Sequence, residues 1–203
     1  MYKNIIFDLD GTLWDSREQI INAWKSIFPN INVSSVDELN NLMGKTTEDF
    51  MNFLFPNCDI NEAIINMTKL EKAEVTYLNT NGANVYTNTI NTINSLSSNH
   101  KLFIVSNCQT GYIESFLNYY NLSDKFIDIE CSGNTKLSKS ENINLIITRN
   151  NLNPNETCYV GDTLSDLNAA INNNIKYIWA RYGFGNNLDC ETSINDISEL
   201  NSF

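Results

Sequence analysis

The pattern of hydrophobic and polar positions divides the chain near residue 83. Between residues 15 and 82, apolar side chains recur every three or four positions, as in the run from Ile20 to Phe28. This spacing is typical of amphipathic helices. The helices predicted in this way cover residues 16–28, 35–43, 46–55 and 61–79. We expect an all-helical insert over residues 15–82 that returns to the rest of the chain at the turn-forming pair Asn81-Gly82.

The remainder of the chain alternates between short apolar runs and amphipathic segments. After the opening run Ile5-Ile6-Phe7, the predicted strands cover residues 101–105, 126–129, 157–160 and 177–179. The predicted helices between them cover residues 89–98, 112–120, 141–150 and 165–172. Such alternation favours an α/β fold with a parallel sheet covered by helices on both faces. We therefore expect a Rossmann-like core of three αβα layers from residues 1–14 and 83–203.

Candidate chemistry is concentrated directly after the first predicted strand. The run there is Asp8-Leu9-Asp10-Gly11-Thr12-Leu13-Trp14-Asp15-Ser16. Two carboxylates two residues apart at a strand end point to the same side, and Gly11 lets the backbone turn so that successive N–H groups face an anion. An Asp-x-Asp-Gly motif alone also fits an ordinary turn, but the paired carboxylates and the turning backbone outline a metal-assisted phosphoryl site.

Two other predicted strands also end in polar residues. Ser106 and Asn107 follow the strand 101–105, and the run Gly161-Asp162-Thr163-Leu164-Ser165-Asp166 follows the strand 157–160. Taken singly, each is explained by a turn or by the cap of a helix. Because parallel strands end at the same edge of a sheet, the carboxylates of Asp162 and Asp166 are expected near Asp8 and Asp10, around one hard cation.

The Asp8–Ser16 run resembles the first signature of the haloacid dehalogenase superfamily, and the Gly161–Asp166 run resembles its fourth. The resemblance implies that Asp8 is the nucleophile and Asp10 the general acid and base. It implies that Asp162 ligates Mg²⁺, together with Asp8 and the backbone carbonyl of Asp10, and that Asp166 supports the metal directly or through water. Ser106 would bind the phosphoryl group, and Asn107 would orient its neighbours.

A lysine forms the third signature of this superfamily. Lys136 and Lys139 both precede the predicted helix 141–150. We prefer Lys139 because the residues that follow it begin the helix, as the family pattern requires, and Lys136 stays the rival.

Four signatures in the right order imply a relative of the phosphoglycolate-phosphatase-like and β-phosphoglucomutase-like members, in which residues 15–82 form a helical cap. The implied activity is Mg²⁺-dependent hydrolysis of a small-molecule phosphomonoester through an aspartyl-phosphate. Asp10 argues against the dehalogenase branch, which has no leaving alkoxide to protonate. A phosphomutase and a non-catalytic phosphate-binding module remain alternatives.

The predicted insert holds a segment, Gly44-Lys45-Thr46, that looks like the end of a nucleotide-binding P-loop. Leu39 stands where that motif needs glycine, and no strand precedes it. The resemblance implies a loop that reaches over the active site, which makes Lys45 a candidate substrate contact. Arg17 and Lys25 are further candidates for specificity, and a phosphonate-cleaving enzyme would need Lys25 or Lys45 as a Schiff-base lysine.

Net charge and composition disfavour several classes of binding partner and site. A net charge of -11 and a pI near 4.4 disfavour nucleic acid, since its binding depends on cationic contacts to phosphates. Five cysteines without a Cys-x-x-Cys spacing, and His100 as the single histidine, give little support to a disulfide framework or a zinc site. The start of the chain has no signal-peptide pattern, and no apolar run suits a bilayer. We expect a cytoplasmic protein with a small phosphate ester as its partner, and we interpret Gly183-Phe184-Gly185 as a simple backbone turn.

Overall fold

The computed structural model describes residues 2–42 and 47–203, which form two compact units. One unit comprises Met1–Asp15 and Asn84–Phe203, and the other comprises Ser16–Ala83. The segment Gly44-Lys45-Thr46, with the candidate substrate contact Lys45, lies outside the described residues.

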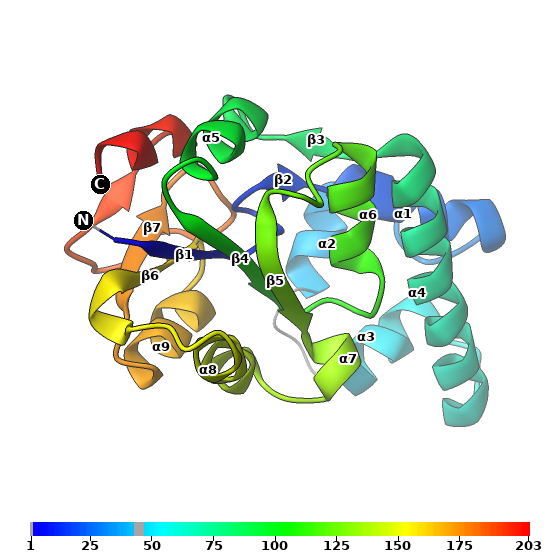
Figure 1. The fold of residues 1–203 in the computed structure, drawn as a ribbon. Helices are drawn as coiled ribbons and strands as arrows, with labels where there is room; N and C mark the ends of the chain where they lie inside the picture. The colour runs from blue at the N-terminus through cyan, green and yellow to red at the C-terminus, as the bar shows by residue number, and fades with distance from the viewer. Residues whose placement is uncertain (1, 43–46) are drawn as a thin grey trace. The chain divides into compact units, whose positions relative to one another are not determined.

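The first unit is built on a six-stranded parallel sheet with the order β5-β4-β1-β6-β7-β8 (Figure 1). Its strands are β1 (Asn4–Phe7), β4 (Lys101–Ser106), β5 (Phe126–Cys131), β6 (Thr157–Gly161), β7 (Lys176–Ala180) and β8 (Ser193–Ile194). Strand β1 lies between β4 and β6, with Phe7 paired to Ile104 on one side and Val160 on the other. All four residues of β1 are buried, as expected for a strand covered on both faces.

Helices cover the two faces of this sheet. Their bounds are α5 (Thr89–Leu96), α6 (Tyr112–Tyr119), α7 (Ser132–Thr135), α8 (Lys139–Arg149) and α9 (Leu164–Asn172), with 3₁₀ turns η1 (Pro154–Glu156) and η2 (Ile197–Ser202). On one face, α8 packs on β4 and β5, and α9 packs on β6 and β7. Helix α5 packs on η2, and Figure 1 shows this pair on the opposite side of the sheet from α8 and α9. The predicted three-layer α/β fold is confirmed.

A two-stranded antiparallel ribbon marks the places where the chain leaves and re-enters this unit. It pairs β2 (Trp14–Asp15) with β3 (Asn84–Val85), and Trp14 faces Val85 in the register. Strands of two residues carry no hydrophobic periodicity, so the sequence pattern did not predict them. The short elements α7, β8 and η2 were missed for the same reason.

The second unit is all-helical, with α1 (Arg17–Ile27), α2 (Val36–Leu42), α3 (Thr47–Leu54) and α4 (Ile60–Asn81). Helices α1 and α4 pack together, and Trp24 Nε1 donates a 2.6 Å hydrogen bond to buried Glu74. The core of this unit consists of Ile21, Trp24, Ile31, Val33, Leu39, Leu54, Phe55 and Leu70. Helix α4 ends at Gly82, whose φ of 64° suits a residue without Cβ.

Within the described ranges, no helix is long and apolar enough to cross a membrane.

Candidate active site

Three neighbouring strands deliver polar side chains to one edge of the sheet. Asp8 directly follows β1, Ser106 is the last residue of β4, and Asp162 directly follows β6. All three side chains are buried. The carboxyl edge of a parallel sheet is where ligands bind in open α/β folds, so this edge is the candidate site.

Three carboxylates gather there. Asp8, Asp162 and Asp166 each offer an oxygen atom, and these atoms lie within 4.8 Å of one another. Burial raises the pKa of Asp8 to about 8; Lys139 opposes this effect, and the charges of Asp166 and Asp162 add to it. Burial, with the charge of Asp166, also raises the pKa of Asp162 to about 6. A positive charge at this place would therefore be strongly favoured.

Lys139 supplies one such charge. Its Nζ lies 3.0 Å from Asp8 Oδ1 and 2.6 Å from Asp166 Oδ1, and its side chain is 8% exposed. Burial lowers the pKa of Lys139, but the charges of Asp8 and Asp166 outweigh it and the net shift is upward. The rival Lys136 is exposed and its Nζ donates to Gly133 O at 2.7 Å. The structure thus brings Lys139, and not Lys136, to the carboxylates.

Asp166 is held by donors on both oxygen atoms. Its Oδ2 accepts from the backbone and hydroxyl of Thr163, at 2.9 and 2.7 Å, which closes the capping box of α9. Its Oδ1 accepts from Lys139 at 2.6 Å, and the Tyr159 hydroxyl, which donates to Val105 O at 2.9 Å, lies 3.4 Å from it. Asp166 therefore positions the Lys139 ammonium and the loop after β6. Tyr159 was not predicted as a site residue, because it lies within a strand.

Asp8 and Asp162 each have a buried oxygen atom that accepts no hydrogen bond from the described residues. Asp162 Oδ1 is buried and accepts no hydrogen bond from the described residues. Asp8 Oδ1 is also buried, and it lies 3.0 Å from the Lys139 ammonium in an ion pair. Buried carboxylate oxygens without donors suit a hard divalent cation, so the residues present fit Mg²⁺.

The loops that contain Gly11 and residues 183–185 both lie against Asp162. Its Oδ2 accepts from the amides of Phe184 at 2.7 Å and Gly185 at 3.3 Å. A Cβ at Gly183 would overlap both Gly11 O and Asp162 Cβ. The interpretation of residues 183–185 as a simple turn is thus incomplete, because this turn wraps the Asp162 carboxylate, a contact that sequence spacing does not reveal.

Gly11 has a φ of 82°, and a Cβ there would overlap the Asp162 carboxylate. Its N–H donates to Trp14 O at 2.9 Å. Gly11 therefore contributes the shape of the loop, while its own amide is used within the loop.

The Asp10 carboxylate is half-buried and stands apart from the cluster of Asp8, Asp162 and Asp166. The hydroxyl of Tyr112, from α6, donates to Asp10 Oδ1 at 3.1 Å. The role of the Asp10 backbone carbonyl as a metal ligand stays a prediction from the resemblance. The sequence held no signal for Tyr112, because it comes from a helix far along the chain.

The structure also describes three other candidate residues, Asn107, Arg17 and Lys25. Asn107 is exposed, and its Oδ1 accepts from Ser132 Oγ at 3.3 Å. In the helical unit, Arg17 Nη1 donates to Asn40 at 2.9 Å, and Lys25 Nζ lies 3.5 Å from Ser34 O.

The family model of the haloacid dehalogenase-like hydrolases matches residues 5–180. Solved structures share the fold over nearly the whole chain. A predicted phosphoglycolate phosphatase from Haemophilus somnus has 18% identity and a TM-score of 0.83, with 99% of this chain and 97% of that chain covered. CbbY from Rhodobacter sphaeroides, in complex with phosphate, has 16% identity and a TM-score of 0.82, with 98% and 96% covered. Magnesium-bound YfnB from Bacillus subtilis has 19% identity and a TM-score of 0.77, with 99% and 97% covered.

None of the curated proteins matches the chain significantly. The family model spans most of the chain and includes Asp8, Ser106, Lys139, Asp162 and Asp166. The chain belongs to the haloacid dehalogenase-like hydrolases.

Proposed function

We propose that the protein is a Mg²⁺-dependent phosphatase that hydrolyses a small-molecule phosphomonoester, with Asp8 as the nucleophile. The observation that carries this proposal is the Asp8 carboxylate at the end of β1, 3.0 Å from a buried ammonium and beside the unsatisfied oxygen of Asp162. The similarity to a predicted phosphoglycolate phosphatase and to phosphate-bound CbbY supports the class of substrate.

The proposed reaction first requires compensation of negative charge. A carboxylate that attacks a phosphate dianion is repelled by it, so cationic and N–H donors must surround the transferring group. In this chain the Lys139 ammonium, the Ser106 hydroxyl and the backbone N–H groups of Leu9 and Asp10 are the proposed donors. Asp8 then forms a bond to phosphorus while the bond from phosphorus to the leaving oxygen breaks.

Asp10 is proposed to carry the proton in both half-reactions. It first protonates the leaving alkoxide, and then takes a proton from the water that hydrolyses the aspartyl-phosphate. The hydrogen bond from Tyr112 fixes the direction of this carboxylate.

Asp8, Asp162 and the backbone carbonyl of Asp10 would hold Mg²⁺, and Asp166 would support the site indirectly through Lys139 and the α9 cap. The bound ion would supply charge that offsets the phosphoryl oxygens.

Phosphate release from small phosphomonoesters tests the proposal. The panel contains phosphoglycolate, sugar phosphates and nucleoside monophosphates, each with Mg²⁺ and with chelator, and the matched variant is Asp8→Asn. We expect metal-dependent release that the variant loses while its circular dichroism spectrum stays unchanged. Full activity of pure Asp8→Asn would overturn the nucleophile assignment.

If no ester is hydrolysed, the panel is repeated with a sugar bisphosphate activator. Isomerisation of a sugar phosphate would identify the alternative phosphomutase. Phosphate binding without either reaction would identify the non-catalytic module.

A further inference from the structure

Asn142 is a fully buried amide side chain one turn after Lys139 in α8. Its backbone N–H donates to Ser138 O at 2.9 Å, and its side-chain amide donates to Leu137 O at 3.4 Å. The first contact is an ordinary α-helical hydrogen bond, and the side chain of Asn142 holds the carbonyl of Leu137, two residues before Lys139. A buried amide is costly unless such hydrogen bonds are made, so this residue serves the turn and not the apolar core.

Thr135 completes the turn. Its Oγ1 lies 2.7 Å from Asn142 Oδ1, 3.1 Å from Leu137 N and 3.3 Å from Cys131 O. A hydroxyl has one proton, and the shortest of these contacts assigns it to Asn142 Oδ1. Thr135, Leu137 and Asn142 therefore close a ring of hydrogen bonds around Lys136, whose φ of 62° is unfavourable for a residue other than glycine.

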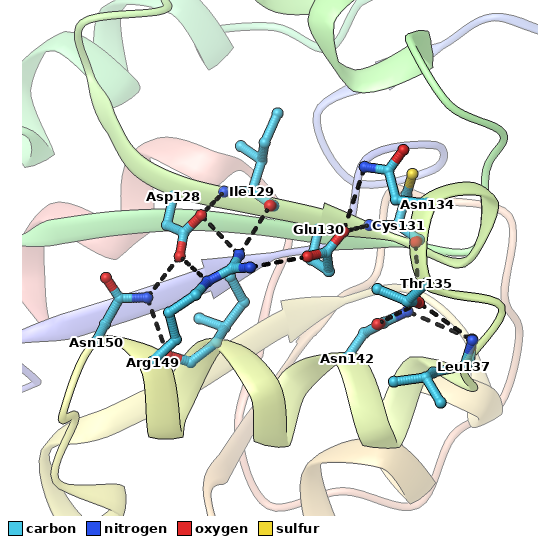
Figure 2. Close-up of polar contacts among 11 residues, drawn as sticks. Asp128, Ile129, Glu130, Cys131, Asn134, Thr135, Leu137, Asn142, Arg149 and Asn150 are labelled. Atoms are coloured by element: carbon cyan, nitrogen blue, oxygen red, sulfur yellow. Dashed lines mark hydrogen bonds and ion pairs between the residues drawn. The ribbon is translucent and has the colours of Figure 1, made fainter.

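The C-terminal end of α8 is bound to the segment from β5 to α7 (Figure 2). Arg149 binds Asp128 through two contacts of 2.7 and 2.8 Å and Glu130 Oε2 at 3.0 Å. Glu130 Oε1 in turn accepts from Cys131 N at 3.1 Å and from Asn134 at 3.3 Å. Both ends of α8 are thus tied to the stretch from β5 to α7, which limits sliding of the helix along β5.

Lys139 needs these contacts at both ends of α8 because of its own position in the helix. It is the first residue of α8, and the positive end of a helix dipole disfavours an ammonium group there. Its Nζ nevertheless has to stay within 3.0 Å of Asp8 and 2.6 Å of Asp166. The position of its backbone therefore decides whether the ammonium reaches both carboxylates.

We infer that Thr135 and Asn142 form a positioning pair that sets the Lys139 ammonium against Asp8. The role of Lys139 in catalysis rests on the proposed function, whereas the placement of its side chain is tested without any activity.

The test compares Thr135→Val, which removes the hydroxyl at nearly constant shape, with Thr135→Ser, which keeps it. Thr148→Val is the matched control, because Thr148 is exposed on the same helix. The first measurement is acetylation of each lysine by acetic anhydride, followed by mass spectrometry. We expect Lys139 to be acetylated about fivefold faster in Thr135→Val because its buried ion pairs loosen. Lys101, which is exposed, serves as the internal reference.

The second measurement is steady-state kinetics on the best substrate of the panel. We expect kcat of Thr135→Val to fall about tenfold with KM nearly unchanged, because a misplaced charge affects the transition state more than binding. Thr135→Ser and Thr148→Val should behave like the unaltered protein in both measurements. If Thr135→Val does not fold, Thr135→Ala takes its place.

Unchanged acetylation of Lys139 in Thr135→Val would overturn the inference, whatever happens to kcat. Equal effects of Thr135→Ser and Thr135→Val would also overturn it, because the hydroxyl would then be irrelevant. Absence of phosphate release from the unaltered protein would count against the proposed function alone, since the acetylation result does not depend on turnover.

Discussion

The hydroxyl of Tyr112 donates a 3.1 Å hydrogen bond to Asp10 Oδ1, and this contact joins α6 to the loop after β1. The tyrosine ring is buried and packs edge-on against Trp14. Tyr112→Phe keeps this packing and removes only the hydrogen bond.

We expect Tyr112→Phe to lower kcat about tenfold on alkyl phosphates, because Asp10, the proposed general acid, loses its orientation. The loss should be much smaller on p-nitrophenyl phosphate, whose leaving group needs no proton. Rates on the two substrates, measured with the same preparation, check the prediction. An equal loss on both would show that Tyr112 does not act through protonation of the leaving group by Asp10.

The stability of the metal-free protein should depend on pH. Burial raises the pKa of Asp8 to about 8 and that of Asp162 to about 6 in the folded state, above the ordinary values in the unfolded chain. The folded state then binds more protons than the unfolded state, so the contribution of these groups to stability falls as pH rises from about 4 to about 8.

Thermal melts in chelator at pH 5.5 and pH 8 should therefore show a lower Tm at pH 8. Added Mg²⁺ should raise Tm more at pH 8 than at pH 5.5, because it binds the deprotonated carboxylates. Asp162→Asn should reduce both effects. A Mg²⁺ effect that is the same at the two pH values in the unaltered protein would contradict this account.

Gly183→Ala should weaken the proposed metal site. A Cβ at this position overlaps Gly11 O and Asp162 Cβ, so the loops around Asp162 have to shift. We expect an overpacking cost of about 1–3 kcal/mol in the free energy of unfolding and a clear loss of Mg²⁺ affinity. Magnesium titration by calorimetry measures the affinity directly.

Gly82→Ala provides the control for general destabilisation. Gly82 ends α4 with a φ of 64°, in the helical unit, so alanine there is also strained. It should cost about 1 kcal/mol in stability without changing Mg²⁺ affinity. Equal Mg²⁺ affinities for the two alanine variants would refute the proposed role of Gly183.

Trp24→Phe should destabilise the helical unit. The variant removes the 2.6 Å hydrogen bond to Glu74, which is 7% exposed. Loss of a donor to a buried carboxylate should cost about 1–3 kcal/mol in the free energy of unfolding. Urea denaturation measures this cost, and Trp24→Phe/Glu74→Gln should recover part of it because the charge is gone.

Local sequence information determined the elements of the fold and the main candidates of the site. Alternation of apolar runs with helical spacing predicted the strands that became β1, β4, β5, β6 and β7, and Asp8, Ser106 and Asp162 stand at strand ends as predicted. These features depend on neighbours in the chain, which hydrophobic periodicity and strand-end polarity report directly.

Only the tertiary structure decided which distant groups hold the site together. The contacts of Tyr112 with Asp10, of Phe184 with Asp162 and of Tyr159 with Asp166 each join different elements. The preference for Lys139 over Lys136 came from the sequence, and the structure adds its contacts with Asp8 and Asp166. The short elements β2, β3, α7 and β8 were likewise set by pairing and packing. Such contacts depend on how the sheet brings remote segments together, and no local pattern of residues encodes that proximity.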